Sequence, residues 1–480
     1  MGVTLYTSRI VLEQLGASDY GVYSIVGGVV TMFAFFNSAM SSATQRYMAY
    51  DLGKNDKNRL QRTFSATLTI HFGIAILILL LAETIGLWYV NHKLVLPPKR
   101  LLAANVVYQF SVATSLIEII QVPYDALIIS HERMNVYAYI SILEAGLRLG
   151  AVFLLIFYGG DKLIAYAVLV FLSLLIIRLT YQVYCRKHFA ESKYKYYYDK
   201  AYYRELISYS GWNLFGNIAT VARGQGLNLV LNLFFGTIVN AAYGLTLQVQ
   251  GAVNLFVANF QKAVNPQIIK AYSQNDLRRT NKLIFQSSKF SFFLLFFIFC
   301  PILFNTEFIL KLWLKTPPLY TTSFVQLGLI GTLIESISRP LMTGAQATGK
   351  IKWYQIVVGS LMFLNLPISF LWSQLTKKPE VVFYTIISIN ILSLLFRLWF
   401  LYKILSFNLK IFFIEVIIRV VIVLCIIILP LVYLFNIGNF VSNDFVKIVI
   451  AFGYSGMVIL FVGINRREFN LIKSLFSKDN

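Results

Sequence analysis

Residues 64–90 read FSATLTIHFGIAILILLLAETIGLWYV, a run of 27 residues in which Glu83 is the only acid and neither Lys nor Arg occurs. About 20 predominantly apolar residues are enough for one helix to cross the hydrocarbon layer of a membrane. This run therefore predicts a membrane-spanning helix.

Twelve further apolar runs of similar length follow or precede it, in a 480-residue chain that is 58% apolar and only 13% charged. Residues 3–15 form a shorter apolar run, which we interpret as the second half of a first helix, for fourteen spans in all. The sequence therefore predicts an all-α polytopic membrane protein. The complete predicted spans are 21–44, 64–90, 101–130, 135–157, 163–185, 207–235, 240–261, 283–304, 320–342, 353–375, 381–401, 409–435 and 445–462.

The net charge of +21 would suggest nucleic-acid binding in a soluble chain, but here the location of the charges matters more. With the partial helix as span 1, and with lysines near span ends assigned to the adjoining connection, the connections after even-numbered spans and the C-terminal tail hold 26 Lys and Arg, against 9 in the other connections. The positive-inside rule then predicts that both chain ends are cytoplasmic. We expect a bacterial inner-membrane protein that contacts membrane lipids and no nucleic acid.

A segment near the N-terminus is repeated about 220 residues later. Leu15-Gly-Ala-Ser-Asp-Tyr-Gly21 and Asn55-Asp56 correspond to Phe235-Gly236, Ala242-Tyr243-Gly244 and Asn275-Asp276. An offset of six helices keeps both copies in the same membrane orientation, which predicts a parallel repeat of two six-helix lobes around a central cavity. Chance similarity between glycine-containing helices is the alternative, and the matched turns argue against it.

The predicted organisation has four parts. Residues 1–185 form the N-terminal lobe with spans 1–6, and residues 186–206 form a cytoplasmic linker. Residues 207–405 form the C-terminal lobe with spans 7–12, and residues 406–480 hold two extra helices and the tail. The linker run Lys193-Tyr-Lys-Tyr-Tyr-Tyr-Asp-Lys200 is typical of an interfacial segment with Tyr at headgroup depth.

The sequence offers no pattern for a metal, a cofactor or a catalytic centre. The three cysteines lack CxxC spacing, the four histidines are scattered, and neither a P-loop nor a nucleophile elbow is present. We expect a transporter and not an enzyme.

Charged side chains at membrane depth are costly, so each one is a candidate for function. Arg223, beside Gln225 and two glycines in span 7, is expected to face a water-filled cavity and to bind a phosphate or carboxylate. Pairing with an acid on another helix, or extension of the side chain to a membrane surface, is the alternative. Arg9 is the corresponding candidate in the first lobe.

Small polar side chains extend this predicted cavity lining along span 2. Ser24, Thr31 and Ser38 have heptad spacing, and the repeat maps the last two onto Asn254 and Gln261. Hydrogen bonds between helices are the alternative role of such groups.

The remaining charges at membrane depth are four acids without an obvious partner, two acid–arginine pairs and two further arginines. The acids Glu83, Glu118, Asp125 and Glu335 are candidates for proton or ion coupling. Pairing with an arginine elsewhere in the chain is the alternative, with Arg339 as one candidate for Glu335. We expect two structural pairs, Glu144 with Arg148 and Glu415 with Arg419. Arg178 and Arg397 are expected to extend to the nearer membrane surface.

Two stretches resemble a known family. Residues 7–23, TSRIVLEQLGASDYGVY, with Ser41-Ser-Ala-Thr-Gln-Arg-Tyr47, and Ser210-Gly-Trp-Asn-Leu-Phe-Gly216 in the second lobe, are similar to the O-antigen-type polysaccharide flippases of the multidrug/oligosaccharidyl-lipid/polysaccharide exporter superfamily. The resemblance covers about residues 1–410. It implies a V of two six-helix lobes with a cationic cavity. Family members begin about twenty residues earlier.

The resemblance implies alternating-access translocation of a polyprenyl-pyrophosphate-linked oligosaccharide for surface polysaccharide such as the O-antigen of lipopolysaccharide. It also implies a polysaccharide polymerase and chain-length machinery as partners. A multidrug or cation exporter of the same fold is the first alternative. A membrane enzyme of polysaccharide assembly, either a polymerase or a ligase, and a scaffold that transports nothing are the others.

Overall fold

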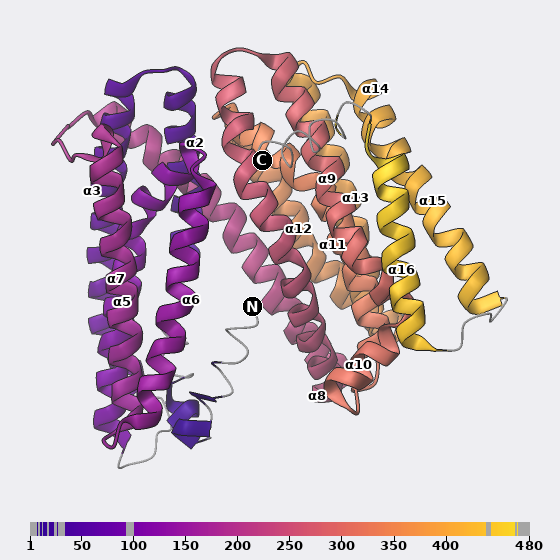
Figure 1. Ribbon diagram of the computed structural model, residues 1–480, viewed down its shortest axis with the longest axis horizontal. Coiled ribbons are helices and arrows are strands. Elements are labelled where there is room, and N and C mark those ends of the chain that lie inside the picture. Colours follow the sequence, from indigo (N-terminus) through magenta and orange to yellow (C-terminus); the bar gives the residue numbers. More distant parts are fainter. Residues whose placement is uncertain are drawn as a thin grey trace, which may run out of the picture. The chain divides into compact units, whose positions relative to one another are not determined.

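The computed structural model describes residues 7, 10–11, 13–16, 19–23, 26, 34–92, 100–437, 443–465 and 468, without the side chains of residues 34–39 and 237. Within these ranges every regular element is a helix, as Figure 1 shows. Nine of the helices in the described ranges are long and apolar enough to cross a membrane. The predicted all-α membrane architecture is therefore confirmed.

The helices follow the predicted spans closely. In chain order they are α2 (Ala34–Gly53), α3 (Lys57–Leu81), η1 (Ala82–Gly86), α4 (Leu87–His92), α5 (Leu101–Ser130), α6 (Met134–Phe157), α7 (Lys162–His188), η3 (Ala190–Ser192), α8 (Lys200–Ser273), α9 (Leu277–Phe304), α10 (Thr306–Leu314), α11 (Thr321–Ala347), α12 (Lys352–Thr376), α13 (Val381–Leu405), α14 (Leu409–Phe412), η4 (Phe413–Ile418), α15 (Arg419–Val432), η5 (Tyr433–Ile437), α16 (Asp444–Val458) and η6 (Ile459–Gly463).

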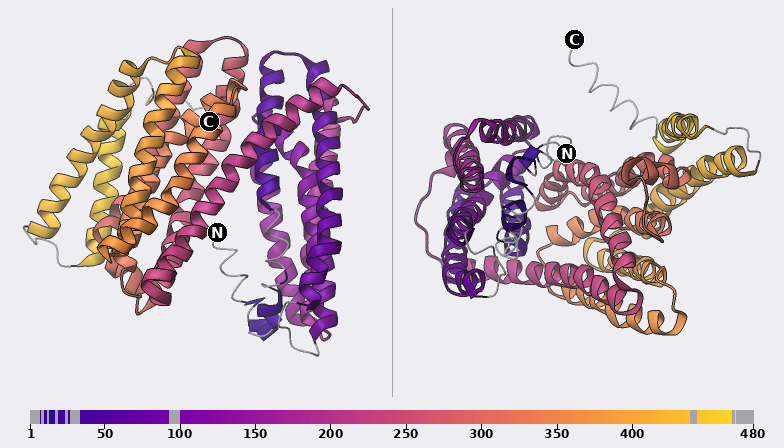
Figure 2. Two further views of the ribbon diagram at one scale, coloured as in Figure 1. Left: turned by 180° about the vertical axis from the view of Figure 1, so that it is seen from behind. Right: turned by 90° about the horizontal axis from the view of Figure 1, so that it is seen from below.

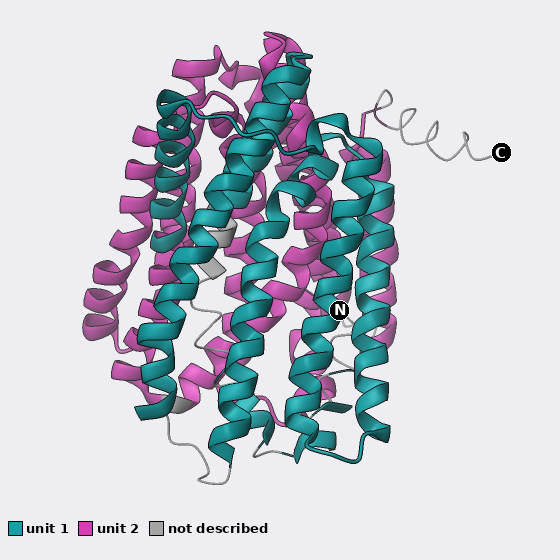
Figure 3. Cartoon of the chain, turned by 90° about the vertical axis from the view of Figure 1, so that its left-hand side faces the viewer, with its two compact units in different colours: residues 1–218 teal, residues 219–480 magenta. Residues whose placement is uncertain are grey.

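The chain divides into two compact units, Met1–Ile218 and Ala219–Asn480, which Figure 3 colours separately. The boundary between the units falls inside α8. The four-part division expected from the sequence stays a prediction. Figure 2 shows the helices of each unit from behind and from below.

In unit 1 the central helix is α5. It packs against α7, α2 and α3, while α6 packs on α7. Tyr108 of α5 is fully buried and its hydroxyl donates to the carbonyl of Ala82 at 2.7 Å. Phe64 of α3 meets Tyr124 of α5 edge to face, with ring centroids 5.1 Å apart. Aromatic side chains of α5 therefore join it to α3 and to η1.

In unit 2 the central helix is α11. It packs between α9 and α13, and α13 also packs on α12. The predicted extra helices are part of this unit, because α16 packs on α9 and on α15. Their shared core is rich in phenylalanine, including the fully buried Phe296, Phe299 and Phe412.

Matched backbone geometry supports the predicted repeat. Gly16 has φ 74° and Gly236 has φ 78°, the region that favours glycine, and Gly236 separates the two helical halves of α8. Asn55 and Asn275 both adopt positive φ as well, at 56° and 58°.

The same turn is capped in the same way in both copies. The carboxylate of Asp56 accepts from the amide of Arg59 at 2.9 Å, and that of Asp276 accepts from the amide of Arg279 at 2.8 Å. Side-chain acceptors at this position satisfy the free amides of a helix start. The two copies thus share a glycine break, a left-handed turn and a helix cap.

The correspondence extends to positions that the sequence analysis did not align. Pro123 inside α5 and Pro340 inside α11 are 217 residues apart, and so are Glu118 and Glu335. Each unit therefore holds a glutamate five residues before a helix proline, on its central helix.

Candidate functional site

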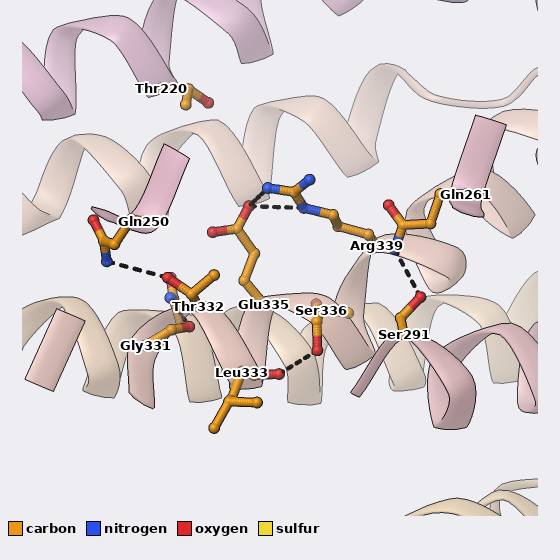
Figure 4. Close-up of polar contacts among 12 residues, drawn as sticks. Thr220, Gln250, Gln261, Ser291, Gly331, Thr332, Leu333, Glu335, Ser336 and Arg339 are labelled. Carbon is orange, nitrogen blue, oxygen red and sulfur yellow. Dashed lines mark hydrogen bonds and ion pairs between the residues drawn. The ribbon is translucent and has the colours of Figure 1, made fainter. Parts of the chain in front are cut away.

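Charged side chains converge inside unit 2 on a single carboxylate. Glu335 of α11 accepts from the Nε and Nη2 of Arg339 at 3.3 and 3.2 Å, one helical turn away, as drawn in Figure 4. The charges of Arg223 and Arg397 also act on this carboxylate. One guanidinium in contact with the carboxylate and two more within electrostatic range of it carry an excess of two positive charges. We name these four residues, Arg223, Glu335, Arg339 and Arg397, the guanidinium cluster.

Arg223 comes from the first half of α8. Its Nη1 lies 3.4 Å from Oδ1 of Asn390 on α13, and the amide of Asn390 donates to the carbonyl of Gly331 at 3.0 Å. Asn390 is buried, so its side-chain oxygen is held in place for the guanidinium. Arg223 itself is half-buried, which leaves donors available for a ligand.

Arg397 is buried, and the prediction that it extends to the membrane surface is wrong. Only 4% of the residue is exposed. Its Nη1 donates to Oγ of Ser338 at 2.6 Å, and its guanidinium carbon lies 5.9 Å from the ring centroid of Tyr354. A hydroxyl, an aromatic face and the charge of Glu335 replace part of the water that the side chain gives up, while the buried Nε of Arg397 has no hydrogen-bond partner among the residues that the structure describes.

A spacing pattern on α13 could have revealed this site. Asn390, Ser393 and Arg397 follow one another at intervals of three and four residues and are all buried. Such intervals place side chains on one helix face. A polar face on an otherwise apolar helix predicts an inward-facing arginine.

Uncharged polar groups continue the polar interior of unit 2 along α8, as Figure 4 shows. Gln250 donates to Oγ1 of Thr332 at 3.1 Å, and the buried Gln261 donates to Oγ of Ser291 at 3.0 Å. Gln261, predicted to line a cavity, thus bonds α8 to α9. Asn254 is half-buried on the same helix, and Gln225 is exposed.

The remaining cavity candidates cannot be placed. Arg9, Ser24 and Thr31 lie outside the described residues, and so does the side chain of Ser38. Their predicted roles stay predictions.

The candidate coupling acids of unit 1 lie in different surroundings. Glu118 is exposed and interacts electrostatically with Arg148 and Glu144. Arg148 and Glu144 form the predicted i, i+4 ion pair, with a distance of 2.8 Å from Nη2 to Oε1. Glu83, in the π-helical turn η1, accepts from Gln109 at 3.1 Å. Asp125 is half-buried and hydrogen-bonds to the hydroxyl of Tyr181. Of these acids, Glu118 is the one that shares its repeat position with Glu335.

The structure also places two further arginines, Arg178, which was expected to extend to the membrane surface, and Arg419, which was expected to pair with Glu415. Arg178 of α7 is half-buried, with its guanidinium carbon 4.3 Å from the ring centroid of Tyr124. Arg419 donates at 3.2 Å to the carbonyl of Val462 and also bonds to Asn465. No ion pair joins Arg419 to Glu415 among the described residues, so that predicted pair is wrong. Backbone and amide acceptors on the neighbouring helix end compete successfully for the guanidinium.

Metal-ligating side chains do not gather in the described ranges: no three His, Cys, Asp or Glu residues are arranged to hold an ion there. The chemistry that the described polar groups offer is binding, by charge and by hydrogen bonds.

The chain is similar to a protein family over more than half its length. A family model described as "Polysaccharide biosynthesis protein" matches residues 2–271. No curated protein matches the chain.

Several solved structures have the same fold. The crystal structure of a MATE mutant aligns with a TM-score of 0.75 and 12% identity over 85% of this chain and 93% of that one. The MATE transporter ClbM in complex with Rb+ aligns with a TM-score of 0.69 and 16% identity over 86% and 93%. A MOP superfamily transporter from Pyrococcus furiosus aligns with a TM-score of 0.70 and 11% identity over 85% and 93%. The chain therefore has the two-lobe helical fold of these multi-pass membrane transporters.

Proposed function

The chain belongs to the polysaccharide biosynthesis protein family, and we propose that it is a flippase for a polyprenyl-pyrophosphate-linked oligosaccharide. The family and the fold are those expected from the sequence resemblance, and they support a transporter of this superfamily. The step beyond them is the substrate.

The guanidinium cluster is the observation that carries this proposal. A pyrophosphate presents several anionic oxygens, and guanidinium groups bind such oxygens through paired, charge-assisted hydrogen bonds. An excess of two positive charges within an apolar helix bundle is costly unless an anion offsets it during the working cycle. Arg223 and Arg339, both partly exposed, are the groups we assign to the phosphates, with Arg397 adding positive charge from a buried position.

We further propose that the two units move in alternating access and that a matched glutamate in each unit can couple this movement to protons or cations. Glu118 and Glu335 occupy the same position of the repeat. Glu118 has the more exposed carboxylate, while Glu335 is paired with Arg339. Glu83 and Asp125 are the other candidates in unit 1.

The proposal places the chain in the bacterial inner membrane with both ends in the cytoplasm. The excess of Lys and Arg in alternate connections, 26 against 9, supports this orientation. Surface polysaccharide such as the O-antigen of lipopolysaccharide would be the end product, with a polymerase and chain-length machinery as partners.

A multidrug or cation exporter is the second candidate, because the solved structures of the same fold include MATE transporters. The two candidates need cavities of opposite charge. A cationic drug is repelled by the guanidinium cluster, whereas a pyrophosphate is attracted to it. This difference favours the flippase.

Complementation tests the proposal. The chain is expressed in a bacterium that lacks its own oligosaccharide flippase, and surface polysaccharide is assayed. We expect the wild type to restore polysaccharide and Arg223→Ala to abolish restoration. Arg279→Ala removes the same charge from an exposed turn and should have no effect.

Equal restoration by Arg223→Ala and Arg279→Ala would contradict the role of the guanidinium cluster. Resistance to cationic drugs without any polysaccharide would instead favour the exporter.

A further inference from the structure

An apolar groove lies within unit 1, between α3 and the beginning of α8. Thr69, Gly73 and Leu77 line it from α3, and Ile207, Gly211 and Leu214 line it from α8. Its volume is about 480 Å³, within the range of about 300–1,000 Å³ that is usual for ligand pockets. We call it the α3–α8 groove.

The side chains that line the groove are partly open to the outside of the unit. Leu77 and Ile207 are 49% and 55% exposed although both line it. Gly73 and Gly211 contribute no side chain, and a Cβ at either position would meet open space. The two glycines therefore widen the groove from opposite walls.

The length of the groove matches one membrane leaflet. Residues 69–77 of α3 span about 12 Å at the usual helical rise of about 1.5 Å per residue. Residues 203–214 of α8 span about 16 Å by the same rise. Both values are about half of the roughly 30 Å hydrocarbon layer. The apolar length thus suits one acyl chain and not a spanning segment.

A basic and aromatic segment closes one end of the groove. The segment 193–198 runs along α3: the amide of Gln61 donates to the carbonyl of Lys193 at 3.1 Å, and the amide of Lys195 donates to Oγ of Ser65 at 3.1 Å. The hydroxyl of Tyr194 lies 3.2 Å from Oγ1 of Thr69, a residue that itself lines the groove. The segment therefore ends where the apolar lining begins.

The exposed side chains of this segment have the chemistry of a lipid headgroup site. Lys193 and Lys195 are exposed on either side of Tyr194, which is 50% exposed. The bonds to Gln61 and Ser65 hold the backbone of both lysines along α3 just before Thr69, where the lining of the groove begins. Tyrosine favours the boundary between hydrocarbon and water, and lysine at that depth attracts anionic headgroups.

We propose that the α3–α8 groove binds one acyl chain of an anionic glycerophospholipid, whose headgroup phosphate is held by Lys193 and Lys195 beside Tyr194. The lipid comes from the leaflet on the side of residues 193–200. This inference concerns a resident lipid of unit 1 and is independent of the transported substrate.

Photo-crosslinking with peptide mapping tests the proposal. The probe is phosphatidylglycerol with a diazirine in one acyl chain, added to the purified full-length chain. We expect cross-links in the peptides that contain residues 69–77 and 203–214. Unlabelled phosphatidylglycerol should compete about thirtyfold better than phosphatidylcholine, since each lysine near the surface contributes about 1 kcal/mol.

Two sets of variants test the acyl-chain site and the headgroup site separately. Gly73→Leu with Gly211→Leu fills the groove and should remove these cross-links, while Gly453→Leu, on α16 and also facing open space, should leave them unchanged. Lys193→Gln with Lys195→Gln should keep the cross-links and abolish the preference for phosphatidylglycerol. The melting temperature of each variant in detergent identifies any that fails to fold, and Gly211→Leu alone then serves as the groove-filling variant.

Cross-links that persist in folded groove-filled protein would overturn the acyl-chain site. Equal competition by phosphatidylcholine in the wild type would overturn the anionic headgroup site.

Discussion

A guanidinium is tolerated inside an apolar bundle where acceptors, opposite charge and aromatic faces replace its water. Arg397 has all three, in Ser338, Glu335 and Tyr354. Arg223 lies in electrostatic range of Glu335 but has only one long hydrogen-bond contact, with Asn390, and remains half-buried. This contrast separates a buried arginine that supplies charge from one that can still bind a ligand.

At the residue scale, sequence reasoning identified Arg223, Glu335 and Arg339 because charges within apolar runs are conspicuous. It misplaced Arg397 because depth was judged from distance to the helix end. The actual position depends on Ser338, 59 residues earlier in the chain, and on Tyr354, and neither contact is visible from local sequence. The pairing of Glu415 with Arg419 failed for the same reason, since the acceptors of Arg419 come from Val462 and Asn465.

The pair of His131 and Glu191 gives a prediction about pH. Nε2 of His131 lies 2.6 Å from the carboxylate of Glu191, and its ring stacks on Phe189 at 4.1 Å between centroids. Burial raises the pKa of Glu191, but the His131 hydrogen bond, a backbone amide and the charges of His131 and Lys57 outweigh it and hold the pKa below the ordinary 4.5. A depressed carboxylate pKa stabilises the fold above the unfolded-state pKa, and this stabilisation is lost as the pH falls through the folded-state pKa.

Thermal unfolding in detergent between pH 3 and pH 7 measures this effect. We expect Glu191→Gln to melt below the wild type at pH 5 to 7, by a difference that corresponds to about 1–2 kcal/mol. The two curves should converge below pH 4.5. A difference that stays constant over the whole range would rule out a role for the ionised carboxylate.

At the element scale, most helix bounds were predictable because each apolar run has the length of one span. The predicted 101–130 coincides with α5, and 381–401 lies within α13. Two features could not be predicted from the apolar runs alone. The π-helical turn η1 is where Tyr108 of α5 donates to the carbonyl of Ala82, and the short α10 lies in what the sequence showed only as a 15-residue connection.

The break in α8 gives a prediction about stability. Gly236 has φ 78° and ψ −172°, a region that is open almost only to glycine, although a Cβ there would meet no neighbour. Gly236→Ala should therefore cost about 1–3 kcal/mol through the backbone alone.

Gly244→Ala is the matched control for this substitution. Gly244 lies in the same helix with helical geometry and open space, so alanine should be neutral or stabilise by up to about 1 kcal/mol. We expect Gly236→Ala to have the lower melting temperature of the two variants in detergent. Equal melting temperatures would show that the strain at Gly236 is relieved by a shift of the chain.

At the scale of the whole molecule, the repeat is the feature that the sequence predicted best. The glycine break and the asparagine–aspartate turn of each copy could be read from the sequence, and the structure gives them closely matched dihedral angles and matched caps. The matched Glu118 and Glu335 were not aligned from sequence, because the offset changes from 220 to 217 between the turn and the central helix. A repeat of this kind gives each unit its own copy of the charged position, while Arg223 and Arg339 have no arginine at the corresponding positions of unit 1.

This asymmetry agrees with our proposal that the guanidinium cluster of unit 2 binds the pyrophosphate of a lipid-linked oligosaccharide during translocation. The most direct measurement is translocation itself, in liposomes that contain the purified chain and a polyprenyl-pyrophosphate-linked oligosaccharide. A lectin added outside reports the oligosaccharide that has crossed.

We predict that the wild type and Arg279→Ala translocate the oligosaccharide and that Arg223→Ala does not. Translocation by Arg223→Ala at the wild-type rate would rule out binding of the pyrophosphate by Arg223.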